Sequence, residues 1–186
     1  MTFLKDDWDY LKNSAEVLEN YLLSSQWMWP DPSGLNDNQR QVQLMPGNVL
    51  LSISRLEAYS WLPADYTRLK DLTATSDGII DHWKHAWDHK MKTESNMRIR
   101  LWNEYISELI KDPKIGGKNY GFQVRTRVII QLFFQLYTGE DPSEQARIAQ
   151  MDMSLRSITR DGPFIWESEI QQGFPFNPYW YLYVKF

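Results

Sequence analysis

The sequence predicts an all-α protein, folded as an up-and-down bundle of about five helices with one long kinked helix and an aromatic, partly extended C-terminal wrap. Apolar residues recur at spacings of three and four through most of the chain, which is the period of one helix face. Clusters of Gly, Pro, Asn and Asp separate these stretches and indicate turns. The chain has 186 residues, 42% of them hydrophobic, which is enough for one substantial core. We therefore expect a single helical domain over residues 1–186.

The first helix is expected over residues 6–24, where acidic residues at the start suit the positive end of the helix dipole. The apolar residues at helical spacing on its inner face are Trp8, Leu11, Ala15, Leu18 and Leu22. Residues 27–38 are rich in turn formers, so we expect a long loop there, anchored by Trp27 and Trp29. Residues 41–44 alternate polar and apolar side chains, which indicates a short extended segment.

Two further helices are expected over residues 46–61 and 64–111. Leu62 separates them, because a residue before proline avoids the helical region. An unbroken helix over 64–111 would measure about 70 Å, whereas a compact domain of this size has a radius of gyration of roughly 16 Å. We therefore expect a kink at residues 73–78, a helix that projects to meet a second copy of the chain, or both.

The most apolar helix is expected over residues 120–137, at the centre of the core, with Gly139 closing it. A fifth helix is expected over residues 141–160. Its start has an Asp-Pro-Ser-Glu sequence, which supplies a capping side chain, a first-turn proline and the acid of a capping box. This start is the most clearly marked helix boundary in the sequence.

The C-terminal residues 163–186 are strongly aromatic, whereas disordered tails are poor in apolar residues. We therefore expect an ordered C-terminal extension that packs on the bundle. Within it, residues 179–184 are expected to be extended and to pair with residues 41–44.

Composition narrows the classes of partner and site. The net charge is -4 and the pI is about 5.4, which argue against nucleic acid or an anionic membrane as a main partner, because clustered Lys and Arg drive such binding. The chain has no cysteine, so disulfides, thiol nucleophiles and Cys-type metal sites are excluded. No apolar signal-peptide segment or membrane span is visible, and we expect a cytoplasmic protein.

All three histidines lie within residues 81–90. On a helix, the spacing places Trp83 and Trp87 on the core side and the histidines on the opposite side. Two aspartates border the histidines, and the resulting polar face suits a divalent metal. The candidate metal ligands are His82, His85, His89, Asp81 and Asp88.

A complete metal site needs more than this face supplies. His85 and His89 have the i, i+4 spacing with which two imidazoles hold one ion, but His82 lies roughly 10 Å along the axis from His89. Further ligands must come from another helix or subunit. No His-Glu-x-x-His or Glu-x-x-His sequence is present. The simpler interpretation is a solvated helix face, and a metal site or a pH-responsive interface is the alternative.

Two arginine pairs flank the Gly116-Gly117 turn, and antiparallel helices would bring them together as a patch for an anionic ligand. Salt bridges to Glu104 and Glu108 would instead give these arginines a structural role. The candidate anion-binding residues are Arg98, Arg100, Arg125 and Arg127. The residues around Lys118 lack the spacing of a phosphate-binding loop.

Aromatic residues make up 15% of the chain, which predicts a bulky core, an aromatic interface or both. Most rings are expected in the core. Because Trp and Tyr concentrate binding energy at interfaces, the tryptophans of the loop and tail are interface candidates. These candidates are Trp27, Trp29, Trp166 and Trp180.

No catalytic set is predicted, because no nucleophile, base and acid arrangement is visible and one helix face carries every histidine. We therefore expect a non-enzymatic helical-bundle protein that acts through protein–protein interaction or assembly, and that forms a homodimer through its long third helix. The alternative is a helical bundle that binds a metal or small ligand on the His82, His85 and His89 face, with or without enzymatic activity.

Overall fold

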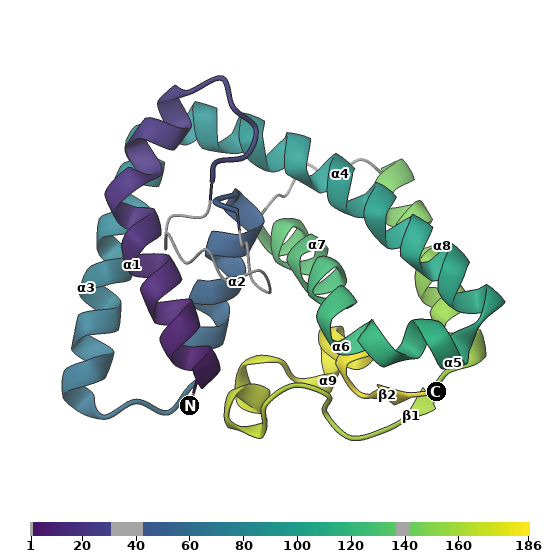
Figure 1. Cartoon of the computed structure of the whole chain (residues 1–186). Coiled ribbons are helices and arrows are strands. Elements are labelled where there is room, and N and C mark those ends of the chain that lie inside the picture. Colours follow the sequence, from purple (N-terminus) through teal and green to yellow (C-terminus); the bar gives the residue numbers. More distant parts are fainter. Residues whose placement is uncertain (1, 31–42, 137–141) are drawn as a thin grey trace. The chain divides into compact units, whose positions relative to one another are not determined.

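A computed structural model describes residues 2–30, 43–136 and 142–186 and confirms the all-α class with an aromatic C-terminal region (Figure 1). Six helices of twelve residues or more dominate the described chain, which also has one pair of two-residue strands. The residues form two compact units, Met1–Glu94 and Ser95–Phe186. The single domain over residues 1–186 stays a prediction.

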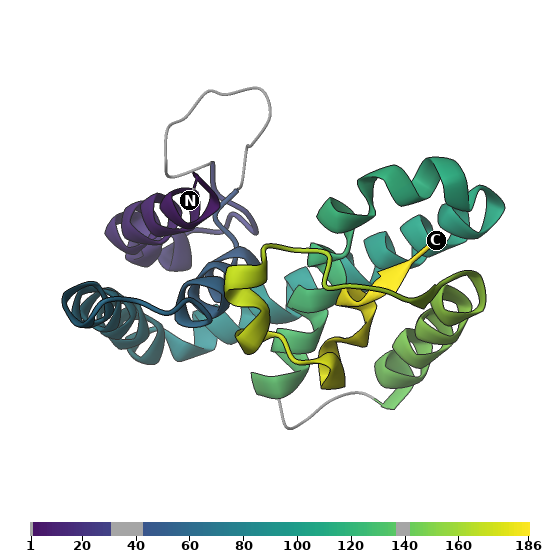
Figure 2. The ribbon, with the colours of Figure 1, turned by 90° about the horizontal axis from the view of Figure 1, so that it is seen from below.

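Unit 1 contains α1 (Thr2–Leu23), α2 (Pro46–Glu57), α3 (Pro63–His82) and the first part of α4 (Lys84–Lys111). Helix α1 packs against both α2 and α3, and α1 and α3 lie side by side in both ribbon views (Figures 1 and 2). The core between them consists of fully buried apolar side chains, because one face of each helix repeats at helical spacing. Its largest members include Leu11, Leu18, Tyr21, Leu51, Leu56 and Leu69.

The expected kink lies at Trp83, so the prediction of a joint at residues 73–78 is wrong. Helix α3 runs without a break through Gly78, and the backbone leaves helical geometry at Trp83 (φ -109°, ψ 32°). The short polar residues that suggested the kink return hydrogen bonds to their own helix: the hydroxyl of Thr75 donates to the carbonyl of Asp71 at 2.9 Å. Such back-bonding lets serine and threonine sit inside a helix.

The break at Trp83 coincides with a contact between its side chain and another helix. The indole Nε1 donates to a carboxylate oxygen of Glu19 on α1, at 3.0 Å. The next helix, α4, begins at once at Lys84. The direction of the chain therefore changes where a tertiary bond fixes a ring, and not where helix-breaking residues cluster.

Two charged residues of α4 bind the free ends of other helices in unit 1. The buried Lys90 ammonium donates to the carbonyls of Ser24 (3.0 Å) and Gln26 (2.5 Å), just past the end of α1. The buried Glu94 carboxylate accepts the backbone N–H of Gly47 (2.7 Å) in the first turn of α2. A cation at a helix C-terminus and an anion at an N-terminus both suit the helix dipole. Burial lowers the pKa of Lys90, and burial together with Glu94 raises the pKa of Tyr21.

A buried ion pair joins α1 to α2. Arg55 Nε lies 2.7 Å from an Asp7 carboxylate oxygen, and Ser52 donates its hydroxyl to the other oxygen at 3.1 Å. Both charged side chains are buried. The carboxylate is thus satisfied on both oxygens, as a buried charge requires.

The predicted pairing of residues 41–44 with residues 179–184 is wrong. Leu44 forms an isolated antiparallel bridge with Trp29, at the ends of the α1–α2 connection. Strand β2 (Val184–Lys185) pairs with β1 (Arg160–Asp161). Most of the loop predicted over residues 27–38 lies outside the described residues, as do residues 41 and 42.

Unit 2 begins with the rest of α4 and turns through three short elements, α5 (Pro113–Gly116), the 3-10 helix η1 (Gly117–Asn119) and α6 (Tyr120–Gln123). Helices α7 (Arg125–Leu136) and α8 (Pro142–Ile158) follow. The helix predicted over 120–137 is thus divided at Val124. The predicted start of the fifth helix at Asp141 lies outside the described residues.

The aromatic C-terminal region packs within unit 2 as short helical turns. These are η2 (Ser168–Gly173), α9 (Phe176–Tyr179) and η3 (Trp180–Leu182), so Val184 alone of the extended segment expected over residues 179–184 lies in a strand. Tyr181 and Leu182 are fully buried. The Tyr120 hydroxyl donates to the Tyr181 carbonyl at 2.8 Å, and the Arg127 guanidinium lies 4.5 Å from the centre of the Tyr181 ring.

Two glycines are expected to respond oppositely to alanine. Gly78 lies in the interior of α3, and no atom stands within 4 Å of the place that a Cβ would occupy. Because glycine weakens helices, Gly78→Ala should raise the free energy of unfolding by about 0.5–1 kcal/mol. At Gly162, a Cβ would lie 3.1 Å from backbone atoms of Val184 and Lys185. Gly162→Ala should therefore lower it by about 1–3 kcal/mol. Urea denaturation measures the free energy of unfolding of both variants. Equal changes in the two variants would contradict the close packing at the β1–β2 pair.

Two buried tyrosines form a second matched pair. The Tyr181 hydroxyl is buried and has no hydrogen-bond partner among the described residues, whereas the Tyr120 hydroxyl has one. An unpaired buried hydroxyl costs about 1–3 kcal/mol, so Tyr181→Phe should keep or raise the melting temperature. Tyr120→Phe leaves the Tyr181 carbonyl unpaired and should lower it. Thermal denaturation of both variants measures this, and a clear loss in Tyr181→Phe would show that its hydroxyl is bonded.

Candidate functional site

The three histidines lie on both sides of the break at Trp83. His82 is the last residue of α3, whereas His85 and His89 lie on the first turns of α4, and all three are exposed. Trp87 is buried, so the prediction that the core side of this stretch is apolar is confirmed there, although Trp83 is only half-buried. His82 does not continue the helix of the other two.

The structure leaves the histidine face short of metal ligands. Asp88 forms an ion pair with Lys84, one turn away on α4, and Asp81 is exposed on α3. Within residues 2–30, 43–136 and 142–186, no three His, Asp or Glu side chains form a group that could hold an ion. The two-imidazole half-site at His85 and His89, like metal binding itself, stays a prediction.

The four arginines predicted to bind an anion do not share one environment. Arg127 is buried and uses Nε and Nη2 on the two carboxylate oxygens of Asp152, at 3.0 and 2.8 Å. This bidentate ion pair occupies the guanidinium, and the hydrogen bond to Asp152 raises its pKa against the opposing effect of burial. Arg125 lies 5.8 Å from the Phe122 ring, and Arg98 and Arg100 lie on α4. Their anion-binding role stays a prediction.

The four candidate interface tryptophans are partly accessible. Trp27 is exposed, and Trp29 is half-buried with its ring edge against Tyr21. Trp166 donates its indole N–H to the Gly121 carbonyl at 2.9 Å, and the ring of Trp180 lies 3.6 Å from the Arg156 guanidinium. Trp29, Trp166 and Trp180 therefore have intramolecular contacts, and all four tryptophans keep an accessible part of their surface.

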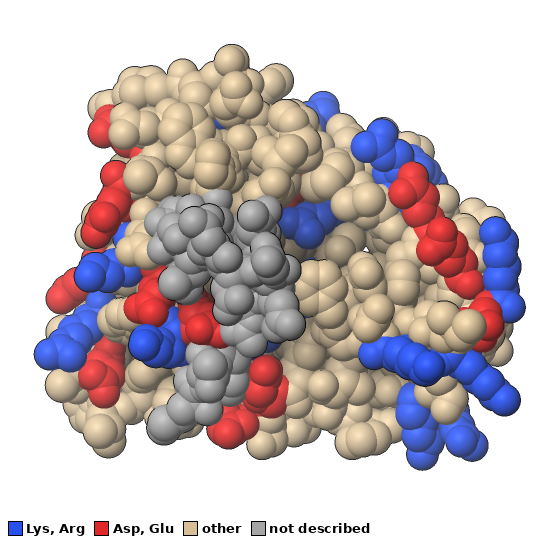
Figure 3. Space-filling model, in the orientation of Figure 1, with Lys and Arg blue, Asp and Glu red and all other residues tan. Residues whose placement is uncertain are grey.

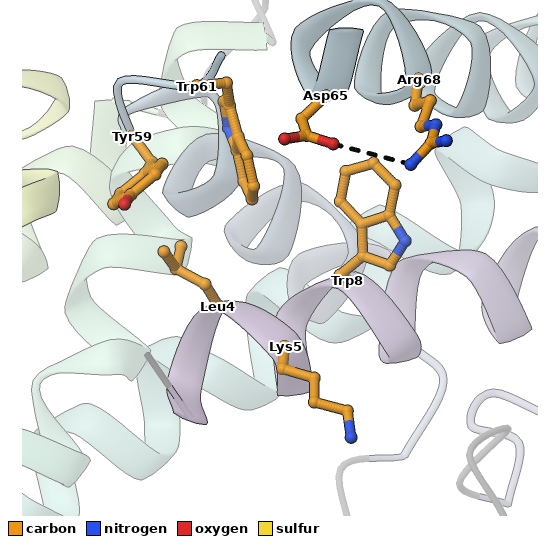
Figure 4. A pocket seen from close by; sticks show the side chains of 7 residues that line it. All are labelled: Leu4, Lys5, Trp8, Tyr59, Trp61, Asp65 and Arg68. Carbon is orange, nitrogen blue, oxygen red and sulfur yellow. Dashed lines mark ion pairs between the residues drawn. The ribbon is translucent and has the colours of Figure 1, made fainter.

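A hollow of about 450 Å³ on unit 1 is the strongest candidate site (Figure 4). It lies between the first turns of α1 and the connection from α2 to α3. Three aromatic rings dominate its wall, with charged side chains around them. The described residues that line it are Leu4, Lys5, Trp8, Tyr59, Trp61, Asp65 and Arg68.

Local structure fixes the rings of the hollow. Trp61 donates its indole N–H to the Leu56 carbonyl at 2.6 Å, near the end of α2. Its ring lies 4.8 Å from the Tyr59 ring and 5.7 Å from the Trp8 ring, both at inclined angles. Figure 4 shows Trp8 rising from α1 toward Asp65 and Arg68 of α3, with Trp61 to one side. Tilted and edge-on contacts of this kind stabilise aromatic pairs, so the wall is formed without a ligand.

Charges lie at the edge of the hollow. Asp65 and Arg68, one turn apart on α3, form an exposed ion pair of 3.6 Å. Lys5 points away from the tryptophan rings (Figure 4). Among the described residues that line the hollow, none is a histidine, serine or threonine. The hollow is therefore suited to bind apolar groups with polar ends.

Comparison with known proteins adds no assignment. No protein-family profile, curated protein or solved structure matches this chain. Within the described residues, no helix combines the length and apolar character needed to cross a membrane.

The half-site at His85 and His89 yields a direct test. Two imidazoles supply half of a tetrahedral zinc shell, so we expect protein purified without a His-tag to retain no stoichiometric zinc after dialysis. Elemental analysis measures this, and thermal denaturation with added zinc should show no shift. The expectation would be contradicted if the protein retained zinc, if His85→Ala and His89→Ala each lost it, and if His82→Ala kept it. That result would establish the metal-binding alternative.

Proposed function

We propose that this chain is a non-enzymatic protein that acts by binding another protein, and that the hollow of Trp8, Tyr59 and Trp61 receives apolar side chains of that partner. The observation that carries the proposal is the composition of its wall. Tryptophan, tyrosine and arginine dominate the hot spots of protein interfaces, and four of the seven lining residues are of these types. A concave wall of fixed rings also binds at little cost in conformational entropy.

The rim of the hollow supports the same function. Leu62, next to Trp61, is 73% exposed, the highest value among the large apolar side chains that the structure describes. Tyr66, next to Asp65, is also exposed. Exposed apolar side chains beside a hollow extend the area that a partner can cover, and such patches mark interaction sites.

Two finer parts of the proposal are a homodimer and a cytoplasmic location. The break at Trp83 changes the argument for the dimer, because the projecting element is no longer a single helix over residues 64–111. Helix α4, with 28 residues and a length of about 42 Å, is what remains of that argument. The absence of cysteine suits a reducing compartment. Sedimentation at high concentration tests the dimer, and a strict monomer would remove it.

The experiment that tests the hollow uses peptides selected on the full chain from a random display library. The affinity of the best peptide is measured by fluorescence anisotropy against variants. We expect Trp8→Ala and Arg68→Glu to weaken it about tenfold or more, as hot-spot substitutions do. Because Arg68 is exposed, Arg68→Glu should fold even where Trp8→Ala does not, so the hollow can be tested with either variant.

Leu23→Ala is the matched control, because Leu23 is an exposed apolar residue of unit 1 outside the hollow, and it should leave the affinity unchanged. Selected peptides are expected to carry Trp, Phe or Leu. Unchanged affinity in both hollow variants would refute the proposed site. Loss of affinity in His85→Ala instead would favour the ligand-binding alternative on the histidine face.

A further inference from the structure

A second surface, on unit 2, differs in chemistry from the hollow. It is the corner formed by α5, η1 and α6, where the chain turns between α4 and α7. Four basic residues lie in residues 110–125 against one acidic residue, although the whole chain carries a net charge of -4. Figure 3 shows Lys and Arg side chains gathered around the place of α5. The basic residues of this segment are Lys111, Lys114, Lys118 and Arg125.

Apolar side chains stand among these charges. Phe122 is 67% exposed and Ile115 is 66% exposed, so most of each side chain is in contact with water. The Arg125 guanidinium lies 5.8 Å from the centre of the Phe122 ring. Leaving two such side chains in water is unfavourable in proportion to the apolar surface that they expose. A partner that covers them recovers this free energy.

The exposure of Ile115 and Phe122 is fixed by the fold of the corner. Asp112 accepts the backbone N–H of Ile115 at 3.1 Å, and the Tyr105 hydroxyl donates to the Gly116 carbonyl at 3.1 Å. Gly116 packs against Leu109 so closely that a Cβ would lie 2.8 Å from a Leu109 methyl carbon. Tyr120 is buried. The corner is therefore preorganised, which lowers the cost of binding.

The lysines of the corner are available to a partner. Among the ion pairs between described residues, none involves Lys111, Lys114 or Lys118. All three side chains are exposed. Asp112, the single acid within the segment, is already engaged by the Ile115 backbone N–H.

We propose that this corner, the Lys-Phe corner (Lys111, Lys114, Lys118, Ile115 and Phe122), binds a segment of another protein that carries acidic side chains next to apolar ones. The carboxylates of that segment meet the lysines, and its apolar side chains cover Ile115 and Phe122. Complementary charge of this kind selects the partner and speeds its encounter with the surface. The inference does not depend on the hollow of unit 1.

The borders of the corner favour a short acidic segment over an extended polyanion. Glu104 and Glu108, both exposed, precede Lys111 on α4 and so end the basic surface on that side. RNA or an anionic membrane presents a continuous negative charge, which these carboxylates repel. A peptide places its charges only where the lysines stand. The apolar side chains add contacts that a phosphate backbone does not use.

The test uses two synthetic peptides of equal length with Leu and Phe at the same positions. At the remaining positions, the Glu peptide has glutamate and the Lys peptide has lysine. Binding to the full chain is measured by fluorescence anisotropy. We expect the Glu peptide to bind, the Lys peptide not to bind, and affinity to fall as salt rises, because salt screens exposed charges. The double variant Lys114→Glu and Lys118→Glu should exchange this preference, a result that a purely structural role would not produce.

Phe122→Ser should lower the affinity for the Glu peptide about tenfold, a loss typical of a central apolar contact. Lys12→Glu with Lys92→Glu is the matched control, because these two lysines are exposed and belong to unit 1, and it should keep the affinity. Arg68→Glu at the hollow should also keep the affinity for the Glu peptide. This variant therefore distinguishes failure of the proposal for this corner from failure of the proposal for the hollow.

Three results would overturn the proposal. The first is equal or absent binding of both peptides, and the second is a charge-exchanged variant that still prefers the Glu peptide. The third is polyuridine RNA or phosphatidylserine vesicles that bind more tightly than the Glu peptide and lose binding in the same variants, which would make the corner a polyanion site.

Discussion

The arrangement of unit 1 depends on two charged side chains of one helix that satisfy the ends of two others. The last carbonyls of an α-helix and its first N–H groups have no partner within the helix. Lys90 binds carbonyls just past the end of α1, and Glu94, one turn further along α4, binds an N–H of α2. Their i, i+4 spacing places both on one face of α4. A single helix face therefore sets where α1 must stop and where α2 must start.

Among the described residues, each unit also contains an ion pair that joins two of its helices and includes a buried charge. Asp7 and Arg55 join α1 to α2, and Arg127 and Asp152 join α7 to α8. Burial of charge costs more than a surface salt bridge returns, so such pairs contribute little net stability. Removal of one partner is costly, however, because it leaves a buried charge unpaired. The two pairs thus disfavour any other register of their helices more than they stabilise the observed one.

The sequence predicted the elements that depend on local pattern and missed those that depend on distant partners. The first two helices were expected near residues 6–24 and 46–61 and are observed at Thr2–Leu23 and Pro46–Glu57. The kink was misplaced because the break lies at Trp83, where the side chain bonds Glu19, 64 residues away in the chain, and no local pattern reveals such a partner. The strand partner of residues 179–184 was wrong for the same reason. Alternation identifies an extended segment but not its neighbour.

The candidate site was hidden for a related reason. Trp8 occupies a helix face whose spacing predicts burial, and Trp61 stands where the second helix was expected to end, so each ring alone suggested core packing. The hollow exists only once the first turns of α1 meet the α2–α3 connection. A pair of tryptophans at an expected helix end and at the start of another helix was the available signal, but spacing within one helix does not reveal it. In the sequence, basic residues at the Lys-Phe corner stood out only within other patterns, namely the arginine pairs and the residues around Lys118.

The positions of the closing contacts along the chain have a consequence for synthesis, which proceeds from the N-terminus. Unit 1 has the contacts that cap α1 and α2 once residue 94 has left the ribosome. Unit 2 waits for Tyr181 and Leu182, which fill its core, and for the carbonyl of Tyr181 that Tyr120 binds across 61 residues. Since domains commonly fold as they emerge, the N-terminal unit gains its structure while the apolar faces of α7 and α8 still lack their cover. The nascent chain is consequently most exposed to aggregation late in translation, after α7 has emerged and before the aromatic C-terminal region follows it.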